Sequence, residues 1–439
     1  MKLTLQLFND NQWHDAFDIV IESPELGKRS KVSLKPLLEY AKKYFDDKGS
    51  RSFTTETAVN LMDIKTYSSW PALFEDIMPM GYAQNQWLNM LNMQNSPTPE
   101  QDVALLRLGT IAPIGNMRIK ESIEHALKDQ VGQLVQMRFV KDKAIERDTD
   151  FLDYARQRGA VSGGATGAGG AAPKLLLRQN DLNEVWVDTE QNDNTTDRHY
   201  LVKFPRNQGQ IDKDILRTEY HYYHELASLG FNTISSNGME LHEGIRNPSL
   251  WLPRFDREMV EGTVNRYGVE SVYSLVNAAS GSYLKHEDVL AKLTTVINTM
   301  TATELAAEYL KRDFLNIVFG NSDNHGRNTS VLKKDNKIYL APIYDFAPMK
   351  ADPESISRTI NWSNQFQQGG NINWLALCDS LSAYGDPSYF KNELCELAVK
   401  LVDLPERLAK RGVPDGILNM PVMGFAYLRV TLEKWELLP

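Results

Sequence analysis

Residues 321–328 read Asn321-Ser322-Asp323-Asn324-His325-Gly326-Arg327-Asn328. The stretch contains an aspartate and an asparagine with four residues between them. A carboxylate can accept a hydrogen bond from an attacking hydroxyl, and a neutral amide oxygen one loop turn later can bind a magnesium ion. The preceding residues 305–319 have helical spacing and end at Gly320, so we expect the loop to start from a buried helix end. Taken alone, a polar turn after a helix is the commoner explanation of such a stretch.

A second signal is the stretch Pro342-Ile343-Tyr344-Asp345-Phe346-Ala347. Short strands predicted at 330–332 and 338–340 place Asp345 directly after a hairpin. An aspartate that ends a strand in a turn is common. The order Asp323, Asn328, hairpin, Asp345 is much rarer, and it is the order in which protein kinases carry their base and their two metal ligands.

A lysine stands within an apolar strand in the run Val202-Lys203-Phe204-Pro205. Burying a lone ammonium group is costly, so this side chain either reaches solvent at a sheet edge or finds a partner. The helix predicted at 211–229 offers Glu219. Such a pair would reproduce the strand lysine and helix glutamate that order the ATP phosphates in kinases.

Residues 159–173 form a glycine-rich segment that ends at Lys174. Small residues let backbone N–H groups approach phosphate oxygens. The segment is not a Walker A loop, because Lys174 has no following Ser or Thr and no helix opens there. A flexible linker explains its composition. Its place about 30 residues before Lys203, bounded by a predicted strand at 175–177, favours a phosphate-covering loop instead.

The bulk composition excludes several classes of protein. The 439 residues suffice for two or three domains, and the net charge of −9 argues against a chain that wraps nucleic acid by itself. The N-terminus lacks the apolar run of a signal peptide, and residues 77–98 are broken by Pro79 and Gly81, which argues against a membrane span. Two cysteines offer no disulfide framework, so we expect a cytoplasmic protein.

The pattern changes twice along the chain. Alternating residues in 1–60 predict a hairpin, and a boundary is expected near residues 96–99. Strands at 175–177, 184–187 and 200–204 precede the 211–229 helix, and helical periodicity dominates from residue 256. The expected domains are 1–100, 101–255 with the glycine-rich loop, and 256–439 with the 321–328 loop.

Further short stretches accompany these signals. They are Phe74–Met78, Ala171-Ala172-Pro173-Lys174, Glu219-Tyr220 and Arg254-Phe255-Asp256. Together with the stretches above they resemble the HipA family, the serine/threonine-protein kinase toxins of toxin–antitoxin systems. The resemblance covers nearly the whole chain. It implies an α+β, divergent two-lobed protein-kinase-like fold with an extra N-terminal subdomain and an all-helical C-lobe.

The resemblance also implies roles for single residues. Asp323 would be the catalytic base, Asn328 and Asp345 would bind Mg²⁺, and Lys203 would bind phosphate of ATP. His325 would orient the loop, although a lone histidine is more often structural. The other residues expected at the nucleotide are Gly169, Gly170, Ala171, Ala172, Lys174, Glu219, Arg254, Phe255 and Tyr344.

The sequence departs from the family in the glycine-rich loop. Well-known HipA proteins carry a serine there that is autophosphorylated and then holds the loop out of the active site. The corresponding position here is Gly167, and the nearby hydroxyls belong to Ser162 and Thr166. We expect autophosphorylation on one of these two residues.

The resemblance implies partners as well. A small DNA-binding antitoxin, similar to HipB, would hold the kinase inactive and place it on operator DNA. The substrate would be a target protein, in the family often an aminoacyl-tRNA synthetase. Two alternatives stay open on the sequence: a small-molecule phosphotransferase, and a non-catalytic nucleotide-binding regulatory partner on DNA.

Overall fold

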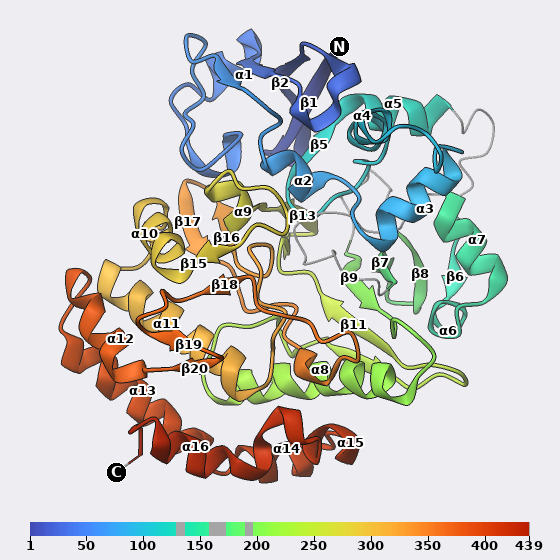
Figure 1. The fold of residues 1–439 in the computed structure, drawn as a ribbon. Helices are drawn as coiled ribbons and strands as arrows, with labels where there is room; N and C mark the ends of the chain where they lie inside the picture. Colours follow the sequence, from blue (N-terminus) through green and yellow to red (C-terminus); the bar gives the residue numbers. More distant parts are fainter. Residues whose placement is uncertain (129–136, 158–172, 189–195, 439) are drawn as a thin grey trace.

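A computed structural model of the chain describes residues 1–128, 137–157, 173–188 and 196–438. Helices and strands are mixed, as the sequence predicts. Figure 1 shows the N-terminal part in blue at the top, a second sheet in green beside it, and the C-terminal helices in red at the bottom. Within the described residues, no helix combines the length and the apolar character needed to cross a membrane.

The N-terminal part is built on a five-stranded antiparallel sheet with the order β4-β3-β2-β1-β5. The predicted hairpin is present, and its alternation places Leu3, Leu5 and Leu7 on the buried face. Five helices complete this part. The strands are β1 (Lys2–Asn9), β2 (Gln12–Ile21), β3 (Val32–Pro36), β4 (Lys65–Tyr67) and β5 (Met117–Ile119), and the helices are α1 (Leu38–Lys43), α2 (Leu73–Ile77), α3 (Tyr82–Met90), α4 (Thr98–Leu108) and α5 (Lys120–Lys128).

The second sheet has six strands in the order β10-β11-β9-β7-β8-β6. Its central strands are buried along almost their whole length, including polar and charged side chains such as those of Arg178 and Lys203. The strands are β6 (Phe139–Val140), β7 (Lys174–Gln179), β8 (Glu184–Val187), β9 (Arg198–Lys203), β10 (Glu240–His242) and β11 (Ser249–Pro253). The helices of this part are α6 (Lys141–Ile145), α7 (Thr149–Gln157) and α8 (Gln210–Ser228).

The C-terminal lobe is mostly helical. It also contains short strands, so the expectation of an all-helical lobe is wrong. Its helices are α9 (Val272–Leu275), α10 (His286–Val296), α11 (Ala302–Val318), α12 (Trp374–Ser380), α13 (Pro387–Leu401), α14 (Leu404–Arg411), α15 (Asp415–Leu418) and α16 (Leu428–Lys434). The predicted hairpin is present as β16 (Ser330–Lys334) and β17 (Lys337–Leu340), and β14 (Gly268–Ser271) pairs with β16.

The other strands that the structure describes in this lobe have two to four residues each. They are β12 (Arg257–Val260), β13 (Thr263–Arg266), β15 (Leu284–Lys285), β18 (Ile360–Asn361), β19 (Gln367–Gln368) and β20 (Asn371–Ile372). Strands of two to four residues are too short to show a period of two, so their pairing depends on tertiary contacts that the sequence pattern does not display.

Three apolar cores hold these parts. One lies in the N-terminal part and extends from Leu3 to Ile119, one surrounds β7 and β8, and the largest extends from Ile114 to Leu437. Helix α8 contributes Leu216, Tyr222 and Leu226 to the largest core. The domain boundaries at residues 100 and 255 stay a prediction.

Helix α8 is also held by a buried charge. Glu225 on α8 has no exposed surface, and it accepts hydrogen bonds from Arg407 Nε at 2.8 Å and Arg411 Nε at 2.5 Å. Both arginines belong to α14, which runs along α8 at the bottom of Figure 1. Tyr222 adds a hydrogen bond from its hydroxyl to the carbonyl of Phe319 at 2.9 Å. These contacts fix α8 against the C-terminal lobe.

Removing the Glu225 charge should destabilise the chain. We expect Glu225→Gln to lower the free energy of unfolding by about 2 kcal/mol, because the charge-assisted hydrogen bonds from the two partly exposed arginines to a buried carboxylate are lost. Urea unfolding followed by circular dichroism measures this. The control is Glu433→Gln, which breaks an exposed ion pair with Arg429 and should cost less than about 1 kcal/mol. Equal effects of the two variants would show that the Glu225 contact does not hold α8.

Candidate active site

A cleft of about 410 Å³ lies between the second sheet and the C-terminal lobe. It brings together residues that the sequence singles out from five segments of the chain: Lys174, Lys203, Glu219, Asp323, His325 and Asp345. Lys174 begins β7 and Lys203 ends β9, and the two are directly opposite in the antiparallel register. Like charges facing each other across strands are unfavourable, so this pair requires a counter-charge.

Asp345 supplies that counter-charge. Its Oδ1 contacts Lys203 Nζ, and its Oδ2 lies 3.4 Å from Lys174 Nζ. Burial alone would raise the pKa of the Asp345 carboxyl, but the two ammonium groups outweigh burial and hold it at about 2. The backbone of Asp345 has a φ of +52°, in the left-handed region that non-glycine residues seldom adopt. Such strain persists only where the surroundings enforce it, and it is concentrated at functional sites.

Lys203 has the partner that the sequence suggests. Its Nζ lies 2.6 Å from Glu219 Oε1, and both side chains are almost completely buried. The alternative of a solvent-facing lysine is therefore wrong. Burial alone would lower the pKa of Lys203, but Asp345 and Glu219 outweigh it and raise the pKa above its ordinary value. Lys203 is a buried, permanently charged ammonium group.

The 321–328 loop begins directly after α11. A capping box between Thr301 and Glu304 starts this helix, and Gly320 ends the segment with a φ of +67°. Gly326 is required inside the loop, because a Cβ atom there would stand 2.6 Å from the ring of Tyr273. The loop thus leaves a buried helix end, as the sequence predicts.

Asp323 is placed in the cleft by this loop. Burial raises the pKa of its carboxyl and Asp345 adds to that effect, while His325 and the two lysines oppose it. His325 Nε2 lies 3.4 Å from Asp323 Oδ1, and His325 Nδ1 accepts a hydrogen bond from the backbone N–H of Arg327 at 3.2 Å. That bond assigns the acceptor role to Nδ1, so in the neutral ring the proton is on Nε2 and faces Asp323.

Asn328 is joined to Asp323 by its side chain. Its Nδ2 donates a hydrogen bond to the backbone carbonyl of Asp323 at 2.5 Å. Its Oδ1 is buried and has no hydrogen-bond partner among the described residues. An unpaired buried amide oxygen costs about 1–3 kcal/mol, so this atom is a ready acceptor for a cation.

The donor set fits a magnesium ion. Mg²⁺ prefers hard oxygen ligands and is usually bound through one or two protein groups plus phosphates and water. The free Oδ1 of Asn328 and the ionised carboxylate of Asp345 are such groups. Among the described residues, no cluster of three His, Cys, Asp or Glu side chains offers a rival metal site.

A second, narrow cavity continues from the cleft toward the link after β11. Lys203 and Asp345 line both cavities. Its walls are mainly apolar, formed by Leu201, Leu252, Ile234, Phe255 and Tyr344 among others. The rings of Phe255 and Tyr344 are stacked, with centroids 5.3 Å apart and 24° between their planes. These walls offer aromatic and aliphatic surfaces against which a flat ring can pack.

Arg254 is brought to this link but is fully engaged there. Its guanidinium contacts Asp188 Oδ2 at 2.5 Å and Asp256 Oδ2 at 2.6 Å. These carboxylates are buried, and Arg254 with Arg257 outweighs burial and lowers the pKa of Asp256 below its usual range. Any contact of Arg254 with a ligand would therefore come from its backbone.

Several expected residues cannot be placed. They are Ser162, Thr166, Gly169, Gly170, Ala171 and Ala172, which lie outside the described residues. Within the described part of the chain, Asn328 lines neither cavity and is joined to the site through Asp323.

Sequence reasoning missed Tyr223. Its hydroxyl donates a hydrogen bond to Glu219 Oε1 at 2.9 Å and accepts one from the N–H of Phe346 at 3.3 Å. It therefore connects the partner of Lys203 to the residue after Asp345. The available signal was its position four residues after Glu219 on one helix, because residues at that spacing are neighbours on a helix face.

Solved structures and curated proteins resemble the chain to different extents. HipA from the Shewanella oneidensis toxin–antitoxin complex of HipA, HipB and operator DNA matches with a TM-score of 0.65 at 13% identity. That match covers 98% of this chain and 97% of HipA, so it shows the same fold. The Helicobacter pylori proinflammatory kinase CtkA matches with a TM-score of 0.36 at 14% identity, over 61% of this chain and 88% of CtkA.

Sequence comparisons agree with this likeness. A Haemophilus influenzae protein named "Putative kinase" is 29% identical over 150 residues, which are 31% of this chain. The match spans only 41% of that protein's length. The model of the family described as "HipA-like C-terminal domain" matches residues 166–403, more than half of the chain. The chain belongs to the family of proteins with a HipA-like C-terminal domain, as the sequence predicts.

Proposed function

We propose that the chain is a serine/threonine-protein kinase that transfers the γ-phosphate of ATP to a protein hydroxyl, as the toxin of a toxin–antitoxin pair. The observation that carries the proposal is the meeting of Asp323, Lys203 and Asp345 in one cleft. These are the base, the phosphate ligand and the metal ligand that phosphoryl transfer requires.

The transfer needs a positioned hydroxyl and neutralised phosphates. Asp323 accepts the proton of the acceptor hydroxyl while the oxygen forms its bond to the γ-phosphorus, and the bond to the β-phosphate oxygen breaks to release ADP. The raised pKa of Asp323 favours this role. His325 holds its Nε2 toward the carboxylate, and Lys174 and Lys203 supply positive charge for the phosphates.

Magnesium would be held by Asn328 Oδ1 and Asp345. When bound, it would supply positive charge that neutralises phosphate oxygens. The ion pairs of Asp345 with two lysines support this assignment. Phosphates bound beside the lysines would pair with the ammonium groups in place of Asp345, and its carboxylate would then be available to the cation.

The base of the nucleotide would enter the apolar cavity beside Phe255 and Tyr344. This cavity has a volume of about 20 Å³, so a purine requires its walls to separate. The glycine-rich loop, with Gly169, Gly170, Ala171 and Ala172, would cover the phosphates. Phosphorylation of Ser162 or Thr166 would add roughly two negative charges there and repel ATP.

The family and the HipA structure, which is a complex with HipB and operator DNA, support a proposal for the partners. We assign to this chain a small DNA-binding antitoxin, operator DNA contacted through that antitoxin, and a target protein such as an aminoacyl-tRNA synthetase. The net charge of −9 supports DNA binding through a partner rather than by this chain alone. The chain would act in the cytoplasm.

Asp323 provides the first test. The purified chain should transfer label from γ-labelled ATP to protein, and Asp323→Asn should lower the rate about 10²–10⁴-fold while ATP binding stays largely intact. Mass spectrometry then locates phosphate on Ser162, Thr166 or elsewhere. Labelling of a metabolite instead of protein would identify a small-molecule phosphotransferase. Bound ATP without any transfer would identify a regulatory nucleotide binder, and either result rejects the protein-kinase proposal.

Asp345 provides a test of the metal. Asp345→Asn should weaken magnesium-dependent ATP binding about tenfold or more, because a charged oxygen ligand is lost from a hard cation. Calorimetric titration of ATP with and without magnesium measures the difference. Asp352→Asn removes another carboxylate that lines the same cleft and serves as the control. If Asp345→Asn keeps the full magnesium dependence of the parent, another group holds the metal.

Lys203 and Glu219 should act as one unit. Lys203→Ala and Glu219→Ala should each lower the transfer rate by about 100-fold, and the double variant should be little slower than either. The initial rates of the four proteins form a double-mutant cycle. Independent effects that multiply in the double variant would show that the 2.6 Å contact has no part in transfer.

A further inference from the structure

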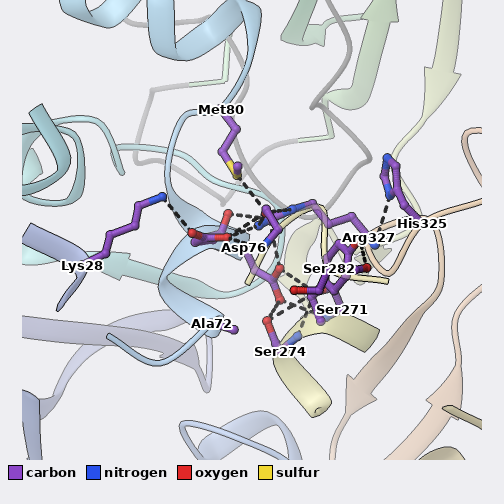
Figure 2. Close-up of polar contacts among 12 residues, drawn as sticks. Lys28, Ala72, Asp76, Met80, Ser271, Ser274, Ser282, His325 and Arg327 are labelled. Atoms are coloured by element: carbon purple, nitrogen blue, oxygen red, sulfur yellow. Dashed lines mark hydrogen bonds and ion pairs between the residues drawn. The ribbon is translucent and has the colours of Figure 1, made fainter. Parts of the chain in front are cut away.

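The N-terminal part reaches the 321–328 loop through one buried arginine (Figure 2). Arg327 lies between His325 and Asn328 in the sequence, and it is 3% exposed. Its Nη2 contacts Glu75 Oε2 at 2.8 Å, and its Nη1 donates to the Glu75 carbonyl at 2.7 Å and to Asp76 Oδ1 at 3.3 Å. Its Nε donates to Ser280 Oγ at 3.0 Å.

The two carboxylates on α2 are held from the other side as well. Lys28 Nζ lies 2.7 Å from Glu75 Oε1. Asp76 accepts hydrogen bonds from the N–H of Ser271 at 2.9 Å and from the hydroxyl of Ser274 at 2.5 Å. The α2 carboxylates therefore have partners on both sides, and they hold the guanidinium of Arg327 in one position (Figure 2).

The buried ion pairs of Arg327 with Glu75 and Asp76 are not expected to add much to the stability of the fold. Asp76 is 1% exposed, and burial raises the pKa of its carboxyl despite the nearby Arg327 and the serine hydroxyls. A buried ion pair often stabilises no more than apolar side chains of the same volume would, because desolvation offsets the attraction. What such a pair does provide is a defined geometry.

The backbone of Arg327 makes hydrogen bonds that position His325 and Tyr344. Its backbone N–H donates to His325 Nδ1, which turns His325 Nε2 toward Asp323. Its carbonyl accepts a hydrogen bond from the Tyr344 hydroxyl. The next residue, Asn328, donates its backbone N–H to the His325 carbonyl at 2.9 Å and its side chain to the Asp323 carbonyl. A displaced Arg327 would therefore move the groups around Asp323.

We propose that Glu75 and Asp76 are positioning residues for phosphoryl transfer, acting through Arg327, so that the N-terminal part completes the active loop. This inference rests on the proposed function. The cleft supports it, since Met80, three residues beyond the end of α2, lines the cleft together with Asp323 and Arg327. The N-terminal part thus contributes directly to the wall beside the loop.

The test compares Glu75→Gln and Arg327→Lys with Asp102→Asn. Arg327→Lys keeps the charge but loses the planar donors that reach several acceptors at once, and it serves if Glu75→Gln fails to fold. Asp102 is a buried N-terminal carboxylate that contacts Lys28 and, in the described part of the chain, has no contact with Arg327. It therefore controls for general destabilisation of the same region.

Two readouts are taken on the full chain. The first is ADP release with MgATP and dephosphorylated casein as acceptor, analysed for kcat and for the KM of ATP. We expect Glu75→Gln and Arg327→Lys to lower kcat about 100-fold, since small misplacements of reacting groups have effects of that size. The KM of ATP should stay within about threefold, and Asp102→Asn should leave kcat within about twofold of the parent.

The second readout is amide hydrogen exchange of residues 321–328, followed by mass spectrometry. Faster exchange there in Glu75→Gln and Arg327→Lys, but not in Asp102→Asn, is expected. An unchanged kcat, or an equal loss in Asp102→Asn, overturns the proposal. If the parent itself shows no Asp323-dependent transfer, the kinase assignment fails, and unchanged exchange in the loop then separately overturns the positioning contact.

Discussion

The site depends on the ion pairs of the Asp345 carboxylate with two lysines. Asp345 lies in a strained backbone conformation between two buried ammonium groups, Lys174 and Lys203. Buried charges require partners, so this one carboxylate fixes the ends of β7 and β9 relative to the segment after β17. Glu219 shares Lys203 and thereby adds α8 to the same arrangement. The cleft exists in this form because four elements meet at these charges.

The rest of the molecule holds that meeting point from outside. Glu225 fixes α8 to α14, and Tyr223 joins Glu219 to the backbone beside Asp345. Arg327 joins the 321–328 loop to α2 of the N-terminal part. Each connection uses a buried polar group whose geometry is more restrictive than apolar packing. These connections fix Asp323, Lys203 and Glu219 relative to one another, which suits the proposed catalysis by positioning and charge neutralisation.

Local patterns predict part of this structure and miss another part for a physical reason. The spacing of Asp323 and Asn328, the hairpin before Asp345 and the Lys203–Glu219 pair are visible in the sequence, because each depends on neighbours or on one strand and its following helix. The contact of Arg327 with Glu75 joins residues 252 positions apart and leaves no local trace. The two- to four-residue strands of the C-terminal lobe likewise depend on tertiary pairing.

We infer that Asn328, Asp345 and the two lysines together form a metal–triphosphate site. A crystal structure of the chain with Mn²⁺ and a non-hydrolysable ATP analogue tests it most directly, with the metal located by anomalous scattering. We expect an anomalous peak bound by Asn328 Oδ1 and Asp345, with the triphosphate beside Lys174 and Lys203 and the base near Phe255. A nucleotide bound outside this cleft, or a metal held by other residues, would contradict it.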